Sequence, residues 1–251
     1  MAEVPGTLEG WYALHDFRRI DWPRFKTLSR DEQQAVLDEF AAFVSEVEGT
    51  TAGSSAIYSV LGHKADLMMI HLRPTVEELN ALERRFAATR FADFTSQTYS
   101  YLSVTELSLY EATARGGSED PEQLKQNPFV QKRLYPAIPD YPYACFYPMN
   151  KKRGEVNNWY ALSMEERRLM MREHGASGRR YHDTITQMIT GSTGLDDWEW
   201  GVTLFAVETL PIKKIVYEMR FDEVSAKYGE FGAFQVGIRV KADKVHEYFS
   251  L

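Results

Sequence analysis

The apolar residues of this chain change their spacing in a fixed order, and that order limits the folds available to it. Over roughly the first hundred residues, strand-like alternation is followed by helical spacing, two short apolar runs, helical spacing again and a last alternating segment. The order strand, helix, strand, strand, helix, strand is that of a ferredoxin-like unit. We therefore expect one such unit in residues 1–111.

The N-terminal elements carry clear boundary signals. Ser29 and Glu32 form a capping box that predicts a helix start, and Gly49 ends the apolar pattern of that helix. Pro74 opens a second helix through about Ala88. The strands around these helices are expected at residues 7–17, 56–61, 67–72 and 98–107.

The same order begins again near residue 141, after a segment rich in glycine and proline. We interpret residues 112–140 as a linker or ordered loop with one short helical piece. Ser163 with Glu166 predicts a helix start, and another helix is expected from near Pro211 to Lys227. The predicted fold class is α+β, with two ferredoxin-like domains of the dimeric α/β-barrel type in one chain. The expected C-terminal domain is 141–251, with strands at 143–147, 198–207 and 233–240.

Composition excludes several classes of function. A net charge of −7 and a pI near 5.5 argue against a broad nucleic-acid surface, which needs clustered basic residues. The single cysteine, Cys145, excludes an intrachain disulfide and is expected to be a small buried residue. No apolar run reaches the roughly 18 residues of a membrane span, and the first residues lack a secretory signal. We therefore expect a soluble, cytoplasmic protein.

The histidines do not form a metal site of several ligands. His174 and His182 are eight residues apart, about 12 Å along a helix, which is too far to share one ion. His174 is expected at the end of an amphipathic helix, where a neutral imidazole can bind iron while its other N–H finds an acceptor. The alternative is an ordinary surface or helix-end histidine. That alternative is favoured more strongly for the others, which are His15, His63, His71, His182 and His246.

The segment from Tyr135 to Arg153 concentrates tyrosines, prolines and three successive basic residues. A tyrosine such as Tyr147 can donate a hydrogen bond or relay one electron, and Lys151 can bind a carboxylate. The alternative is that the aromatic residues are core and the basic residues are a solvated strand end. No glycine-rich phosphate loop follows a strand, so nucleotide binding is unsupported.

The segment Tyr147-Pro148-Met149-Asn150-Lys151, with a downstream helix ending in Arg172-Glu173-His174-Gly175, resembles the coproheme decarboxylase branch of the chlorite-dismutase-like haem proteins. The resemblance covers most of the chain. It implies a ring-shaped homopentamer and a porphyrin held in the C-terminal half. The implied reaction is the peroxide-dependent removal of two propionate carboxyls from iron-coproporphyrin III (coproheme), which gives haem b and carbon dioxide. Transient contact with a ferrochelatase-type enzyme upstream is also implied.

The resemblance assigns roles by motif position. His174 is the iron ligand, Tyr147 is the residue that becomes a radical, and Lys151 is its neighbouring base or carboxylate partner. Coproheme carries four carboxylates, so an acidic protein must supply cations at the rim of the pocket. Arg133 and Ser225 are expected at propionates, and Arg179 is a further candidate. The full set of implied porphyrin contacts is Arg133, Tyr147, Pro148, Met149, Asn150, Lys151, Gln187, Arg220 and Ser225.

The resemblance implies that chlorite-converting members of the family have an arginine on the distal side, at the position that matches Gln187 here. Glutamine cannot supply that positive charge, so decarboxylation is favoured over chlorite dismutation and peroxide activation is expected to be slow. An unbroken helix would separate Gln187 from His174 by about 20 Å, so a break is expected at Gly175 or Gly178. Three alternatives stay open: a peroxidase or chlorite activity, a haem carrier without turnover, and an oligomeric protein without porphyrin.

Overall fold

The computed structural model describes residues 4–109, 112–113 and 120–250. Its N-terminal half has the predicted order of elements, and the capping box of Ser29 and Glu32 is formed. A short helix, α1 (Trp22–Phe25), follows the first strand. The main elements of this half are β1 (Thr7–Ile20), α2 (Arg30–Glu48), β2 (Ser54–Val60), β3 (Leu67–Arg73), α3 (Val76–Ala87) and β4 (Thr95–Ser108).

The C-terminal half repeats the order, and the capping box of Ser163 and Glu166 begins its first long helix. Two short helices, α5 (Pro121–Gln126) and α6 (Pro128–Leu134), precede it where a single helical piece was predicted. The elements of this half are β5 (Tyr143–Lys151), α7 (Met164–Arg179), β6 (Ile185–Gly191), β7 (Trp200–Ala206), α8 (Thr209–Met219), α9 (Glu223–Tyr228), β8 (Gly229–Phe231), β9 (Gln235–Arg239) and α10 (Val245–Phe249).

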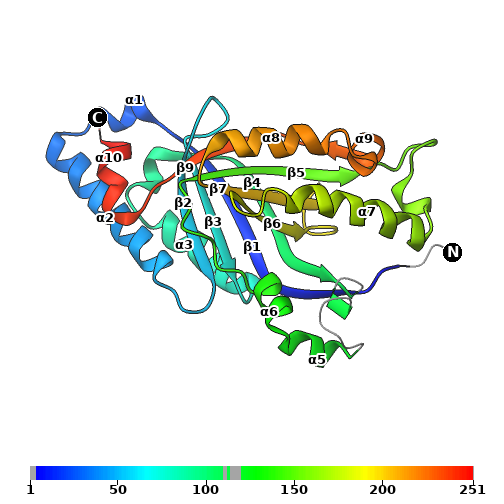
Figure 1. The fold of residues 1–251 in the computed structure, drawn as a ribbon. Coiled ribbons are helices and arrows are strands. Elements are labelled where there is room, and N and C mark those ends of the chain that lie inside the picture. Colours follow the sequence, from blue (N-terminus) through cyan, green and yellow to red (C-terminus); the bar gives the residue numbers. More distant parts are fainter. Residues whose placement is uncertain (1–3, 110–111, 114–119, 251) are drawn as a thin grey trace.

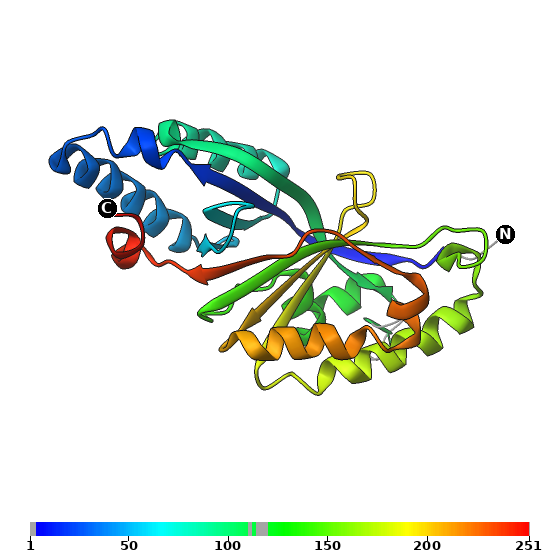
Figure 2. The same cartoon turned by 90° about the horizontal axis from the view of Figure 1, so that it is seen from above.

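The strands of the two halves join in one antiparallel sheet that closes on itself. Within the described residues the strand order is β7-β6-β4-β1-β3-β2-β9-β5-β8, and an additional β7–β5 pairing closes the ring. Figure 1 and Figure 2 show α2 and α3 beside the strands of the N-terminal half and α7, α8 and α9 beside those of the C-terminal half, whereas α10 lies next to α2. The expected pair of ferredoxin-like units of the barrel type is confirmed. The domain limits at residues 111 and 141 stay a prediction.

The sequence placed two helices of the C-terminal half wrongly. The helix that carries His174 does not end at Gly175 but continues to Arg179, so neither Gly175 nor Gly178 breaks it. The single helix expected from Pro211 to Lys227 is two helices, because the Asp222 side chain caps a new one. Within the described part of the chain, none of the helices combines the length and the apolar character that spanning a bilayer requires.

Two histidines expected at the surface are buried inside the barrel. His15 Nε2 lies 2.8 Å from Thr203 Oγ1, and the His15 ring packs on Phe146. His71 Nδ1 lies 2.8 Å from Ser55 Oγ. Burial lowers the pKa of both His15 and His71 to about 3. Both imidazoles are therefore neutral in the folded protein at neutral pH.

This burial predicts a loss of stability in mild acid. The unfolded chain protonates these histidines below a pKa near 6.5 while the folded chain does not, so stability falls as pH drops below that value. At pH 5 each histidine lowers the free energy of unfolding by about 2 kcal/mol relative to pH 7. We expect His15→Gln to lose less stability between pH 7 and pH 5 than the wild type in urea unfolding. The exposed His182→Gln should match the wild type, and equal losses in all three proteins would contradict the account.

Candidate functional site

Tyr147 and Gln187, two of the predicted site residues, lie on the outer face of the C-terminal sheet. Tyr147 of β5 pairs with Val202 of β7, which pairs with Ile189 of β6. One step along the same face, Cys145 pairs with Leu204, which pairs with Gln187. Directly paired residues point to the same side of an antiparallel sheet. Tyr147 and Gln187 therefore share this face, about 12 Å apart by the spacing of strands and residues.

Tyr147 is held in an apolar setting by two phenylalanines. Its ring stacks on Phe234 at 4.3 Å and approaches Phe231 at 6.0 Å, and its side chain is only 8% exposed. Burial raises the pKa of the Tyr147 phenol well above its usual value, and the nearby Arg220 opposes this only in part. The phenol is therefore protonated at any physiological pH and keeps a hydrogen atom to give.

His174 is oriented by a carboxylate from a distant part of the chain. Its Nδ1 donates to Asp222 Oδ2 at 2.8 Å. Asp222 also caps α9, where it accepts from the backbone N–H of Ser225 at 2.8 Å. Burial lowers the pKa of His174, although Asp222 opposes the shift. The imidazole is therefore neutral, with Nδ1 carrying the proton, and no described residue hydrogen-bonds Nε2.

Lys151 is buried beside Trp159 and lies near the carboxylates of Asp222 and Glu199, rather than in solvent. Its Nζ lies 4.9 Å from the centre of the Trp159 ring. Its backbone N–H donates to the buried Glu199 at 2.9 Å. Burial lowers the pKa of Lys151 to about 8, while Asp222 and Glu199 oppose the shift. The alternative of a solvated strand end holds for Lys152 and Arg153, which are exposed, but is wrong for Lys151.

Gln187 and His174 do not lie on one helix, so the predicted separation of about 20 Å along a helix does not apply. After α7 ends at Arg179, the chain turns and enters β6, which carries Gln187. A Cβ placed on Gly178 would lie 3.3 Å from Gln187 Nε2 and 3.8 Å from Met219 Cε. Gly178 therefore allows close approach between the end of α7 and this strand, and it does not bend the helix. Gln187 faces α7, which carries His174.

The other predicted contacts are distributed unevenly. Strand alternation places Met149 beside Tyr147 and Lys151 on the outer face, whereas Pro148 and Asn150 point to the other side. Asn150 Oδ1 accepts from the backbone N–H of Glu199 at 2.8 Å, so its side chain fixes the strand end. Any contact of Pro148 or Asn150 with a ligand on the outer face would come from the backbone.

The four predicted cation and hydroxyl contacts lie on different elements. Arg220 follows α8, and its guanidinium stacks on Phe231 at 3.7 Å. Ser225 lies on α9, where its hydroxyl is 3.4 Å from Asp222 Oδ2. Arg179 is exposed at the end of α7. Arg133 lies on α6, which packs on β1 and β4, and no hydrogen bond or ion pair joins it to the other site residues within the described part of the chain.

Five residues at this site were not predicted from the sequence: Asp222, Glu199, Trp159, Phe231 and Phe234. Asp222 followed three residues later by Ser225 is a helix-cap signal, but it says nothing of a histidine 48 residues away. The phenylalanines and Trp159 have no local signal that separates them from ordinary core residues. Only the folded arrangement shows that they enclose Tyr147 and Lys151.

The donor set of this site fits a porphyrin iron. The described residues contain no group of three or more His, Cys, Asp or Glu side chains able to hold a free metal ion. A single neutral histidine whose Nδ1–H donates to a carboxylate leaves Nε2 free to bind a metal that has its other ligands elsewhere. A tetrapyrrole supplies those four nitrogen ligands itself, so His174 alone suffices.

We expect Asp222→Asn to weaken the binding of ferric porphyrin by about 10- to 100-fold, because an amide neither fixes the Nδ1 proton nor raises the basicity of Nε2 as a carboxylate does. Titration of the Soret absorbance measures the affinity. Asp183→Asn is the matched control, since Asp183 contacts His182, a histidine that is 74% exposed. Equal effects of the two substitutions would show that Asp222 does not act through His174.

Known proteins resemble this chain in sequence and in fold. A sequence profile described as chlorite dismutase matches residues 33–240. A protein from Thermus thermophilus, described as a novel haem-binding protein, is 42% identical, with a TM-score of 0.91 over 100% of this chain and 99% of its own. Chlorite dismutase from Candidatus Nitrospira defluvii in complex with imidazole is 20% identical, with a TM-score of 0.76 over 97% of this chain and 96% of its own. At 20% identity, the likeness to this chlorite dismutase shows a shared fold alone.

Proposed function

This chain belongs to the chlorite dismutase family, and we propose that within it the chain acts as a peroxide-dependent coproheme decarboxylase. The observation that carries the proposal is a buried, protonated phenol, Tyr147, on the same sheet face as Gln187, which lies next to α7, while α7 carries a neutral His174 held by the Asp222 carboxylate. Haem binding is supported by the 42% identical protein described as haem-binding.

The proposed substrate is iron-coproporphyrin III, whose iron, when bound, supplies the site for oxidation by hydrogen peroxide. Each propionic acid side chain and one peroxide give a vinyl group, one carbon dioxide and two water molecules. The carbon–carbon bond to the carboxyl group breaks, a carbon–hydrogen bond is lost, and peroxide accepts the two electrons. Two such turnovers give haem b.

Each residue of the chain has a distinct part in this reaction. His174 Nε2 would bind the iron, and Asp222 holds the proton on Nδ1 so that Nε2 keeps its lone pair. Tyr147 Oη would give up its hydrogen atom and then take one from the propionate. Lys151 and Arg220 would bind carboxylates and so bring a side chain to the phenol.

The neutral side chain of Gln187 favours decarboxylation over chlorite conversion. A cation on that face would stabilise an anionic oxidant, and glutamine offers only hydrogen bonds of its amide. The same absence of charge predicts slow activation of peroxide.

The lowered pKa of Lys151 predicts a pH dependence of substrate capture. Below about pH 8 the ammonium is charged and binds a propionate, and above that pH the charge is lost. We expect kcat/KM for coproheme to fall as pH rises from 7 to 9, and Lys151→Arg to flatten that fall because guanidinium stays charged. Lys152→Arg, on the exposed neighbouring residue, should leave the profile unchanged. An unchanged profile in Lys151→Arg would remove Lys151 from substrate binding.

Mass spectrometry of the porphyrin tests the function itself. Purified protein is incubated with iron-coproporphyrin III and hydrogen peroxide, and the porphyrin is extracted. We expect stepwise loss of two carboxyl groups as carbon dioxide and the appearance of haem b. An intact porphyrin after many equivalents of peroxide would contradict the proposal, and oxygen release from added chlorite would favour the chlorite activity instead.

A further inference from the structure

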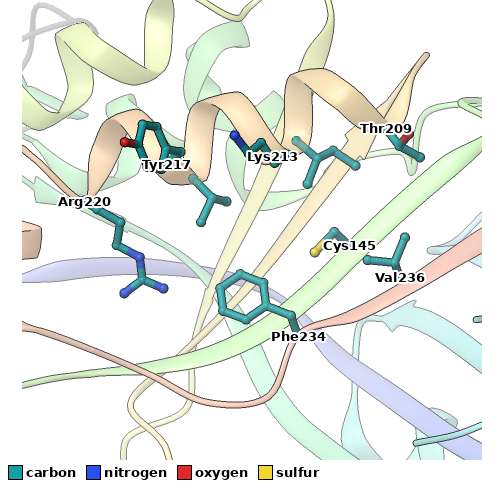
Figure 3. A pocket seen from close by; sticks show the side chains of 9 residues that line it. Cys145, Thr209, Lys213, Tyr217, Arg220, Phe234 and Val236 are labelled. Atoms are coloured by element: carbon teal, nitrogen blue, oxygen red, sulfur yellow. The ribbon is translucent and has the colours of Figure 1, made fainter. Parts of the chain in front are cut away.

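A groove of about 410 Å³ runs along α8 on the side away from the helix that carries His174. Its apolar wall combines Cys145 of β5 with Phe234 and Val236 at β9. Figure 3 shows Lys213, Tyr217 and Arg220 along the α8 side of this groove. We call it the α8 groove, and its lining residues are Cys145, Thr209, Ile212, Lys213, Val216, Tyr217, Arg220, Phe234 and Val236.

The α8 groove and α7 use opposite sides of α8. Glu218 accepts from Tyr181 Oη at 2.7 Å and pairs with Arg180, and both partners follow α7. With 3.6 residues per turn, Glu218 projects on the side of α8 opposite to the middle of the groove-lining face. The body of α8 therefore separates the groove from the helix of His174, and a ligand in the groove does not need the iron ligand.

The rim of the groove carries two cations without acidic partners. Among the described residues, Lys213 contacts the Tyr217 ring and Arg220 the Phe231 ring, and neither forms an ion pair. They are seven residues apart on one helix face, about 10 Å along the axis. In a chain of net charge −7, this local positive pair suits a ligand that bears at least two carboxylates. A fatty acid, with one carboxylate, would leave one cation unused.

Aromatic side chains continue from the groove to the reaction site. Phe234 lines the groove and also stacks on Tyr147. Tyr217 is 59% exposed at the rim and packs edge to face with Phe221, which is 73% exposed. Flat rings of this kind offer stacking surfaces to a planar conjugated ligand. The groove is also too small to enclose a whole tetrapyrrole, so such a ligand would insert one edge.

We propose that the α8 groove binds a carboxylate-bearing edge of a porphyrin without iron ligation, as a second porphyrin site beside the reaction site. The inference rests on the proposed function for its ligand class, and Lys213 is the new residue that it assigns. Lys213 and Arg220 bind two propionates of one edge, while Tyr217 and Phe234 contact the ring. Arg220 is shared with the reaction site, so it binds a porphyrin in one of the two sites at a time, and Lys213 belongs to the groove site. Porphyrin can then be held next to Tyr147 before or after the iron is bound by His174.

Metal-free coproporphyrin III tests this site, because it has the carboxylates but no iron. Its binding to the His174→Ala protein is measured by fluorescence anisotropy. We expect binding to persist in His174→Ala and to weaken at least about tenfold when Lys213→Glu is added, since a cation contact becomes a like-charge contact. Added salt should weaken binding to His174→Ala and have a smaller effect once Lys213→Glu is present.

Lys214→Glu is the matched control, because it changes the same charge on the next residue, which does not line the groove. It should alter the affinity less than about twofold. Coproporphyrin tetramethyl ester should bind independently of residue 213, and palmitate should not displace coproporphyrin. Equal affinities in the Lys213→Glu and Lys214→Glu proteins, or displacement by palmitate, would overturn the inference. Decarboxylation without this binding would contradict the groove site but not the proposed function. Binding without decarboxylation would contradict the proposed function but not the groove site.

Discussion

Tyr147→Phe is expected to retain coproheme and to lose decarboxylation. The substitution removes only Oη, so the stacking on Phe234 and the shape of the pocket remain, and the affinity for coproheme should change less than about threefold. The phenolic hydrogen is the atom that the proposed reaction uses, so the rate of vinyl formation should fall at least about a hundredfold. Soret titration measures the binding, and mass spectrometry of the extracted porphyrin measures the rate.

Tyr143→Phe is the matched control for this prediction. Tyr143 lies on the same strand and the same face, two positions beyond Cys145, and its loss should leave the rate within about twofold of the wild type. A Tyr147→Phe protein that still forms haem b at the wild-type rate would exclude the phenol from the chemistry. A different result would support a haem carrier without turnover. In that case the wild type binds coproheme and forms no product, and Tyr147→Phe behaves in the same way.

His174→Ala should lose the iron ligand while the protein stays folded. The imidazole is partly exposed on α7 and its removal leaves the apolar core intact, so the main loss is the bond from Nε2 to iron. We expect the affinity for ferric coproheme to fall at least about tenfold, about 1.4 kcal/mol, and the Soret band to change to that of a porphyrin without imidazole. Decarboxylation should become undetectable.

Two further measurements separate ligation from structure in this variant. Added imidazole should restore the wild-type Soret band to His174→Ala by filling the space of the lost side chain. His182→Ala, which removes an exposed histidine at the end of the same segment, should keep the wild-type spectrum throughout. A wild-type spectrum in His174→Ala without imidazole would assign the iron to another residue.

The order of helices and strands was largely predictable because both halves show the same sequence of helix-start signals and apolar spacings. Capping boxes at Ser29 and Ser163 and the alternation of short apolar runs fix the order of elements without any distant contact. Strand β6 is the exception, since no strand was predicted there. Its segment has no long apolar run, and it becomes a strand because it lies between β4 and β7.

Burial was predicted less well than element order, since it depends on contacts between distant segments. His15 and His71 lie inside the ring of strands that the β7–β5 pairing closes. The residues next to them in the sequence do not indicate that the sheet closes. Lys151 ends a strand beside two other basic residues, yet Trp159 and Glu199 cover it. The family resemblance therefore singled out Tyr147, Lys151 and His174 as candidates, whereas the neighbours that set their protonation states, such as Asp222 and Phe234, are seen only in the fold.

A crystal structure of this chain with iron-coproporphyrin III would test the central claim most directly. We expect His174 Nε2 to bind the iron while Nδ1 keeps its hydrogen bond to Asp222, and Tyr147 Oη to face a propionate between the ring and the sheet. An iron bound by any other side chain, or a porphyrin whose propionates all lie away from Tyr147, would contradict it.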